Sequence, residues 1–211
     1  MDFIKNPRAI EDKSMDIIDE LLGPVDFTTE ELAIIKRIVH TTGDPNYASL
    51  VKIHPEAIER GIEALKGGAS IFTDVKMIQA GINSRVLGEF GGEVYCDISS
   101  PAISEEAKRT GLTRALTAFR SWGKKIDGSI VAIGNAPTAL FEVLRLAEEE
   151  NIRPALVVGI PVGFVGAAES KEALVNSDLP YITIPGTKGG STITVATLNA
   201  LLYLARGARW D

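Results

Sequence analysis

Two segments in the C-terminal half of the sequence share one order: a short apolar run, a break at glycine, and a helical pattern. They are Ile130–Leu140 and Leu156–Ser170. The apolar runs are rich in β-branched residues and bounded by Gly and Pro, which predicts buried strands of a parallel sheet. Loops that follow such strands lie at the carboxyl edge of the sheet, where α/β proteins bind ligands. The two segments therefore indicate both a class of fold and a place for a site.

Short strands alternate with helices along the chain from Ala69 onward. We expect strands at residues 69–73, 94–98, 129–133, 155–159 and 181–184. We expect helices between and after them at residues 74–80, 104–125, 137–149, 169–175 and 192–205. This alternation is typical of a doubly wound α/β fold, with a mainly parallel sheet and helices on both faces.

The first 66 residues show helical patterns instead of this alternation. We expect helices at residues 13–22, from Thr28 to a break at Gly43, and at 55–65. Thr28 and Glu31 have the spacing of a capping box, which marks the start of the second helix. No internal repeat or linker interrupts the sequence, so we expect a single domain, residues 1–211, with a helical N-terminal segment.

The composition argues against several classes of function. Lys and Arg number 22 against 28 Asp and Glu, and the net charge of −6 disfavours nucleic acid as a partner. No apolar run approaches the roughly 20 residues of a membrane span, and the N-terminus lacks the apolar core of a signal peptide. Cys96 is the single cysteine and there are two histidines, so we expect neither an internal disulfide nor a zinc site. A cytoplasmic location without a bound metal is the expectation.

The spacing of the glycines disfavours the familiar nucleotide-binding loops. Gly159, Gly163 and Gly166 do not have the G-x-G-x-x-G spacing of a dinucleotide site. Lys188 comes too early in its segment for a phosphate-binding loop, in which the lysine directly precedes Ser or Thr. Backbone amides at a helix start near Ser191 could still bind an anion such as a carboxylate. The alternative is that these glycines only permit tight turns between strands and helices.

Two histidines are available for acid–base chemistry. His40 follows Arg37 by three residues and shares the polar face of the second expected helix. The helix end favours the imidazolium and Arg37 opposes it, which makes His40 a candidate for proton exchange. The alternative is a solvated histidine at a helix end. His54 precedes Pro55 in a non-helical segment and is interpreted as structural.

Three segments together resemble a known family of enzymes. Arg37–His40, Val131–Leu140 and Gly159–Lys171 are similar to the precorrin-8X methylmutases, also called cobalt-precorrin-8 methylmutases, and the similarity extends from about Ala9 to Leu202. The resemblance implies an enzyme of cobalamin biosynthesis that moves a methyl group from C-11 to C-12 of a corrin precursor. The product is hydrogenobyrinic acid or cobyrinic acid. The reaction needs no redox cofactor and no protein-bound metal, so no cofactor is expected.

The same resemblance implies roles for individual residues. His40 is the expected proton donor and acceptor, and Ser14 and Arg37 match positions that contact the substrate. The substrate carries several carboxylates, so further contacts are expected from Asn83, Ser84, Arg85, Thr113, Arg114, Gly134, Asn135, Gly163, Phe164, Val165, Gly189, Gly190 and Ser191. The alternative for Arg85 and Arg114 is that they are solvated surface arginines. The alternative for Phe164 and Val165 is that they pack on the apolar macrocycle.

The resemblance also implies a corrinoid substrate and a homodimer with its sites near the subunit interface. Two other functions remain open on the sequence. One is an α/β enzyme that uses a nucleotide, against which the glycine spacings argue. The other is a tetrapyrrole-binding carrier without catalysis, which would bind corrin intermediates and leave the methyl group at C-11.

Overall fold

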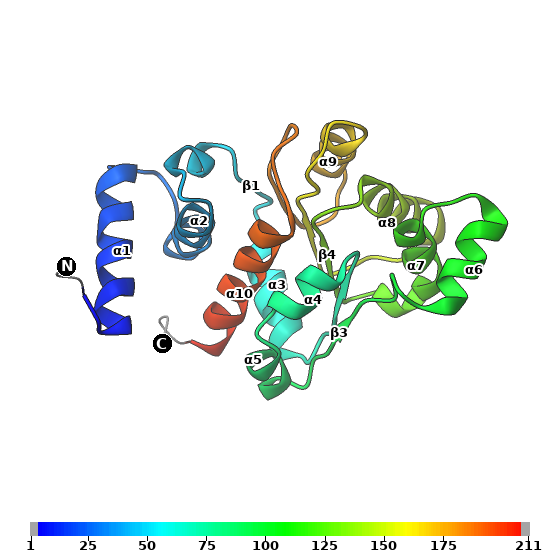
Figure 1. The fold of residues 1–211 in the computed structure, drawn as a ribbon, viewed down its shortest axis with the longest axis horizontal. Coiled ribbons are helices and arrows are strands. Elements are labelled where there is room, and N and C mark those ends of the chain that lie inside the picture. The colour runs from blue at the N-terminus through cyan, green and yellow to red at the C-terminus, as the bar shows by residue number, and fades with distance from the viewer. Residues whose placement is uncertain (1–3, 208–211) are drawn as a thin grey trace.

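A six-stranded sheet forms the centre of the computed structural model, which describes residues 4–207 (Figure 1). The order of the strands across the sheet is β1-β6-β5-β4-β2-β3. Their bounds are β1 Lys52–Ile53, β2 Ile71–Thr73, β3 Val94–Tyr95, β4 Ile130–Ile133, β5 Leu156–Gly159 and β6 Tyr181–Thr183. All neighbouring pairs are parallel except β1 and β6. The expected domain of residues 1–211 includes residues 1–3 and 208–211, which lie outside the described part.

The central strands β4 and β5 are buried along their whole length, as their continuous apolar runs predict. Ile130 pairs with Leu156 and Ile133 with Gly159, so the two strands end level with each other. Both glycine-punctuated loops therefore begin at the same edge of the sheet.

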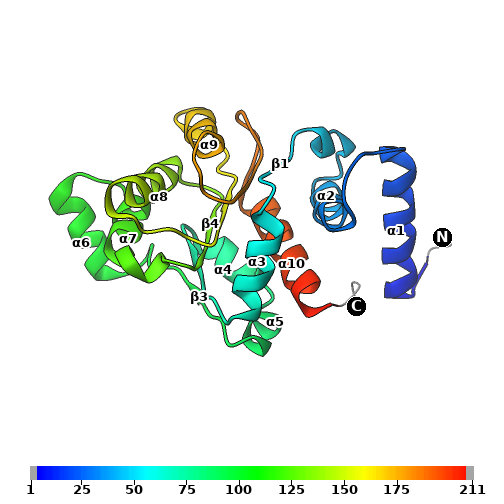
Figure 2. The ribbon, with the colours of Figure 1, turned by 180° about the vertical axis from the view of Figure 1, so that it is seen from behind.

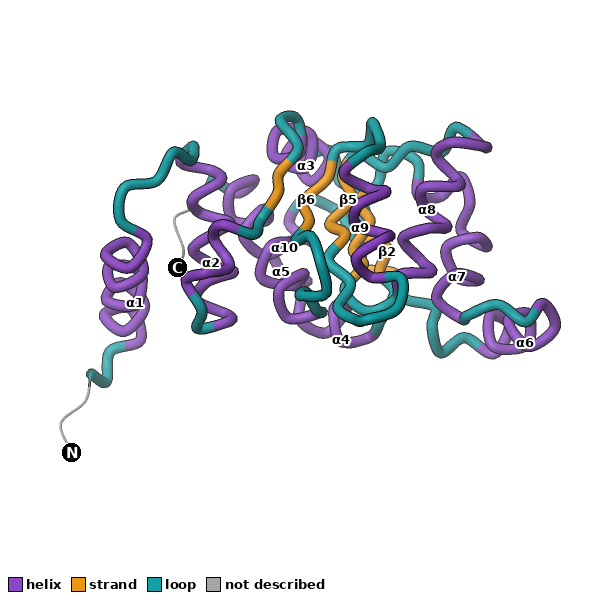
Figure 3. Tube along the Cα trace, turned by 90° about the horizontal axis from the view of Figure 1, so that it is seen from above, coloured by secondary structure: helices purple, strands orange, loops and turns teal. Residues whose placement is uncertain are grey.

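Helices cover both faces of the sheet, which confirms the doubly wound α/β fold (Figure 3). One face is covered by α3 Ala57–Lys66, α4 Lys76–Gly81, α5 Ser84–Glu89 and α10 Ser191–Arg206. The other is covered by α6 Pro101–Thr110, α7 Arg114–Trp122, α8 Pro137–Glu150 and α9 Ala167–Val175. Within residues 4–207, no helix has both the length and the apolar character needed to cross a membrane.

The N-terminal helices form an outer layer beside α10. Helix α1, Pro7–Leu22, packs on α2, Thr29–Thr42, and α2 packs on α10. The predicted capping box is present: Thr28 Oγ1 accepts from Glu31 N at 3.2 Å, and Glu31 Oε2 accepts from Thr28 N at 2.8 Å. Helix α1 lies at one end of the molecule and α6 at the other (Figures 1 and 2).

The prediction places no strand before residue 69, and this is wrong between α2 and α3. A short 3₁₀ helix, Pro45–Ser49, is followed by β1, which pairs antiparallel with the edge strand β6. His54 N then donates to Tyr181 O at 2.9 Å and extends the pairing. A strand of two residues carries no readable periodicity, because its conformation comes from its partner.

The helix expected at residues 104–125 is in fact two helices, α6 and α7, followed by a 3₁₀ turn, Gly123–Ile126. Gly111 ends α6 with a positive φ of 73°, and Thr113 Oγ1 caps α7 by accepting from Leu116 N at 3.3 Å. The helix α5 was not expected. It begins where Asn83 Oδ1 accepts from Val86 N.

Candidate active site

The carboxyl edge of the sheet has a reversal in strand order between β2 and β4. The chain passes from β2 to β3 on one side and returns to β4 on the other side of β2. In open α/β sheets, ligands bind in the crevice at such a switch point. The carboxylate of Asp74, which directly follows β2, occupies this crevice and is buried.

Asp74 ties the loop after β4 to the loop after β2. Its Oδ1 accepts from Gly134 N at 3.2 Å, and its Oδ2 accepts from Asn135 N at 2.9 Å and Ala136 N at 2.6 Å. Burial raises the pKa of the Asp74 carboxyl, against the opposing effect of these three donors. All three amides of this loop thus donate to Asp74. The substrate-binding role of Gly134 and Asn135 stays a prediction. The side chain of Asn135 is exposed.

The loop after β4 also touches the start of α10. A Cβ on Gly134 would lie 2.8 Å from the Cα of Ser191 and 2.9 Å from its nitrogen. Both neighbours are backbone atoms that have no room to move, so this position requires glycine. Gly134 and its neighbour Asn135 thus meet Ser191, which is distant in the sequence, at one point of the edge.

The segments 160–166 and 185–190 lie side by side as two paired loops. Gly190 N donates to Ile160 O at 2.9 Å, and Gly163 N donates to Thr187 O at 3.1 Å. Gly189 has a φ of 157°, and a Cβ there would lie 2.4 Å from the oxygen of Ile160. These contacts also engage the amides of Gly163 and Gly190, so those two donors serve the protein itself.

Phe164 and Val165 form the tip of the first paired loop. Their side chains are 91% and 90% exposed, the highest values among the large apolar residues in the described part of the chain. Apolar side chains held out in this way are typical of a surface that contacts a ligand or another protein.

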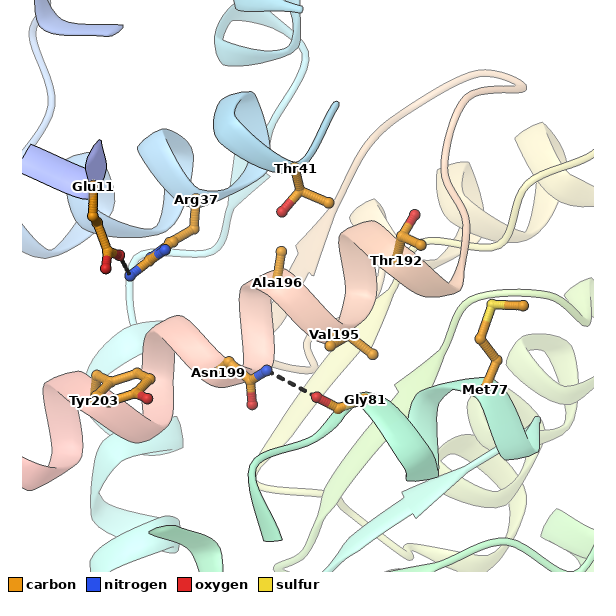
Figure 4. Close-up of a pocket in the computed structure, with 10 residues that line it drawn as sticks. All are labelled: Glu11, Arg37, Thr41, Met77, Gly81, Thr192, Val195, Ala196, Asn199 and Tyr203. Carbon is orange, nitrogen blue, oxygen red and sulfur yellow. Dashed lines mark hydrogen bonds and ion pairs between the residues drawn. The ribbon is translucent and has the colours of Figure 1, made fainter. Parts of the chain in front are cut away.

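A groove of about 560 Å³ lies between α2, α4 and α10 (Figure 4). Its lining residues are Glu11, Arg37, Thr41, Met77, Gly81, Thr192, Val195, Ala196, Asn199 and Tyr203. Arg37 points across the groove and forms an ion pair with Glu11 of α1. Asn199 Nδ2 donates to Gly81 O at 3.0 Å and so joins α10 to the end of α4.

His40 lies in the last turn of α2, between the groove residues Arg37 and Thr41. Its side chain is exposed and is not part of the groove lining. The end of α2 is close to the paired loops, because Lys188 Nζ lies 3.9 Å from the carboxylate of Asp44. The fold therefore brings His40, the groove and the paired loops to one side of the molecule.

Ser14 and the segment after α4 lie near the groove. The hydroxyl of Ser14, one turn along α1 from Glu11, donates to Ile10 O at 2.7 Å. Asn83 N donates to Asn199 Oδ1 at 2.9 Å, and Asn83 Nδ2 donates to the hydroxyl of Tyr203 at 3.2 Å. Asn83 thus supports two residues of the groove, while Ser84 and Arg85 are exposed beside it.

Thr113 and Arg114 are not brought to this groove. They begin α7, on the face of the sheet opposite α10. The Oγ1 atoms of Thr113 and Thr138 are 2.7 Å apart, which links α7 to the start of α8 at the carboxyl edge. Arg114 is exposed. The substrate-binding role of these two residues stays a prediction.

Sequence reasoning missed two buried charged residues at this edge. Asp74 could have been noticed as an acid directly after a strand rich in apolar residues. Lys171 lies within α9 and is completely buried, and its Nζ donates to Lys188 O at 2.7 Å. Burial lowers the pKa of Lys171 to about 8. Nothing in the helical pattern around Lys171 distinguishes it from a surface lysine.

Comparisons with known proteins identify the family. The sequence profile of the family described as precorrin-8X methylmutase matches residues 9–204. The chain is 48% identical over 199 residues to a cobalt-precorrin-8 methylmutase of Priestia megaterium, covering 94% of this chain and 88% of the relative. It is 41% identical over 214 residues to that of Salmonella typhimurium, covering 99% and 100%.

A solved structure agrees with these sequence relatives. The crystal structure of a precorrin-8X methyl mutase from Thermus thermophilus superposes with a TM-score of 0.88 at 42% identity, covering 95% of this chain and 97% of the other. A match of this length and identity includes the helical N-terminal segment as well as the sheet. The chain therefore belongs to the precorrin-8X methylmutase family, and it is an isomerase that moves a methyl group within one molecule.

Proposed function

We propose that this enzyme moves the methyl group of precorrin-8X or cobalt-precorrin-8 from C-11 to C-12, giving hydrogenobyrinic acid or cobyrinic acid in cobalamin biosynthesis. The observation that carries the proposal is the last turns of α2, where His40 stands between two residues of an open groove, Arg37 and Thr41. An exposed imidazole beside a groove can contact a large flat ligand, and the ligand does not have to enter a closed cavity.

His40 acts as proton donor and acceptor in this proposal. Its imidazolium gives a proton, or a hydrogen bond, to a ring nitrogen of the corrin, which changes the conjugation and favours the migrated isomer. The bond from the methyl group to C-11 breaks as the bond to C-12 forms, and the proton returns to His40 afterwards. Because the migration takes place within one molecule, positioning of the macrocycle supplies much of the remaining rate enhancement.

The macrocycle offers the protein two kinds of surface, the carboxylates of its side arms and its flat apolar face. Arg37 and Ser14 hold carboxylates of its side arms, and the exposed rings and methyl groups of Phe164 and Val165 pack on its apolar face. Among the remaining predicted contacts, Ser84, Arg85 and Arg114 are exposed and available to further carboxylates.

A homodimer is part of the same proposal. Large apolar side chains other than the paired-loop tip are exposed on α1, with Ile17 at 46% and Leu21 at 61%. A partner subunit would remove this surface from water. Sedimentation at micromolar concentration should give the mass of two chains, and a monomer alone would contradict the dimer. A cytoplasmic location and a single domain of residues 1–211 stay predictions.

The experiment is the absorption spectrum of the purified protein mixed with precorrin-8X. The wild type should give a new product band, because the rearrangement changes the conjugated system. His40→Ala should lose this conversion and keep tight binding, whereas the control His54→Ala should convert normally. His54 is half-buried, and its Nδ1 accepts from Glu56 N at 3.2 Å, so it serves the local turn.

Each alternative has its own outcome in this experiment. Binding without any product band in the wild type would identify a carrier rather than an enzyme. Full turnover by His40→Ala would overturn the role of His40 while leaving the methyl shift intact. Measurable binding of NAD or ATP would revive the nucleotide-using enzyme.

A further inference from the structure

Lys171 is a buried ammonium group without a matching acid. Its side chain is completely buried, and among residues 4–207 no carboxylate lies within ion-pair distance of it. Burial of an unmatched charge costs stability, which agrees with the lowered pKa of this group. A methionine or leucine would fill the same space without that cost. The ammonium is therefore explained by what its hydrogen bond does.

That hydrogen bond fastens the paired loops at their centre. The carbonyl of Lys188 accepts from Lys171 Nζ at 2.7 Å. The residues on either side of Lys188 are already held, since Thr187 O accepts from Gly163 N and Gly189 packs against Ile160 O. Of these three neighbouring contacts, at Thr187, Lys188 and Gly189, the hydrogen bond from Lys171 is the one made by a side chain. It is also the one whose donor carries a full charge.

The side chain of Lys188 points from the same position toward the end of α2. Its Nζ lies 3.9 Å from the carboxylate of Asp44 and 5.0 Å from the centre of the Tyr47 ring. The distance to Asp44 is at the upper limit of an ion pair, and half of the Lys188 side chain is exposed. The ammonium of Lys188 is therefore open to a second carboxylate on the side of the molecule that carries His40.

We propose that Lys188 binds a carboxylate of the substrate and that Lys171 is the positioning residue that holds Lys188 in place. The inference rests on the proposed function, because a substrate rich in carboxylates is what gives an exposed lysine at this edge a partner. Lys171 does not touch the substrate. It acts through the carbonyl of Lys188, so the two residues should behave as one unit.

Turnover kinetics test the link between the two lysines. Lys188→Met should raise KM roughly tenfold, the loss of about one charged contact, with kcat changed less than threefold. Lys171→Met should raise KM to a similar extent, and the double variant should be no worse than either single one. The control Lys108→Met, an exposed residue of α6, should leave both constants unchanged. Additive effects, or an unchanged KM in either single variant, would overturn the inference.

Limited proteolysis gives a readout that needs no substrate. Trypsin cuts after Lys188, at the carbonyl that accepts the hydrogen bond from Lys171. Loss of this hydrogen bond should let the loop open more often. The folded Lys171→Met protein should therefore be cut there about tenfold faster than wild type. An unchanged rate would overturn the role of Lys171. Failure of the proposed function is read separately, from absence of turnover in the wild type. Lys188→Met alters an exposed side chain, so its KM still tests the carboxylate contact of Lys188 if Lys171→Met does not fold.

Discussion

Asp74→Asn tests how the carboxyl edge of the sheet is held together. The substitution keeps the shape of the side chain and removes its charge. One oxygen remains and can keep the two shorter bonds, from Asn135 N at 2.9 Å and Ala136 N at 2.6 Å. The new NH₂ group then faces Gly134 N, which loses its acceptor.

The expected cost follows from these three contacts. Loss of the charge on the two retained bonds costs about 1 kcal/mol each, and the unpaired buried donor of Gly134 adds about 1–3 kcal/mol. Removal of a carboxylate that was costly to bury, as its raised pKa indicates, returns part of this energy. We therefore expect Asp74→Asn to lower the free energy of unfolding by about 2–4 kcal/mol.

Urea unfolding at pH 7 measures this difference, with Asp127→Asn as the matched control. Asp127 also accepts from a backbone amide, Arg153 N at 2.7 Å, but its side chain is exposed and water can replace the bond. The control should therefore lose less than about 1 kcal/mol. Equal losses in the two variants, or a loss under about 1 kcal/mol for Asp74→Asn, would refute the argument that buried amides depend on this carboxylate.

Three further substitutions probe other parts of the same structure. Gly189→Ala places a Cβ 2.4 Å from a backbone oxygen of the neighbouring loop, and thermal unfolding should show a loss of about 1–3 kcal/mol, where an unchanged midpoint would contradict the tight pairing. Glu142 is buried, which opposes its ionisation, but hydrogen bonds from Arg120 and Arg145 together lower its pKa below the ordinary 4.5. The stabilisation that ionised Glu142 gives the folded protein is present above pH 4.5 and is lost as the pH falls through its pKa in the folded state. The difference in free energy of unfolding between wild type and Glu142→Gln should therefore narrow in acid. Lys171 has a pKa of about 8 in the folded protein against 10.5 ordinarily, so the unfolded state binds more protons between these values. Wild type should therefore gain about 3 kcal/mol relative to Lys171→Met between pH 7.5 and 10.5, and a constant gap would contradict the burial of the charge.

The sequence predicts the elements whose cause is local. The β-branched runs of β4 and β5 and the capping box of Thr28 and Glu31 carry their own signals, and all of them are confirmed. The strand β1 could not be predicted, because two residues become a strand only beside β6. The segments on either side of Gly111 are both helical, so the sequence predicts one helix there, and Gly111 divides it into α6 and α7.

The same distinction applies to the candidate site. Arg37 and His40 share a helix face through a spacing of three residues, so the sequence alone places them together. The contact of Asp74 with Gly134 spans 60 residues, and it exists only because β2 and β4 become neighbours in the sheet. Lys171 and Lys188 meet because the loops that follow β5 and β6 are paired. Contacts of this kind depend on strand order, which no local pattern contains.

The charges around the groove explain how a protein with a net charge of −6 can receive a carboxylate-rich ligand. Arg37 of the groove is paired with Glu11, and Lys188 of the paired loops lies near Asp44, so each of these two cations already has an acid of the protein beside it. In the proposed function, a substrate carboxylate that binds Arg37 or Lys188 exchanges places with Glu11 or Asp44 rather than filling an empty positive site. Such an exchange spares the free protein the cost of an unmatched half-buried guanidinium, and it makes affinity depend on the difference between two carboxylates rather than on the total positive charge.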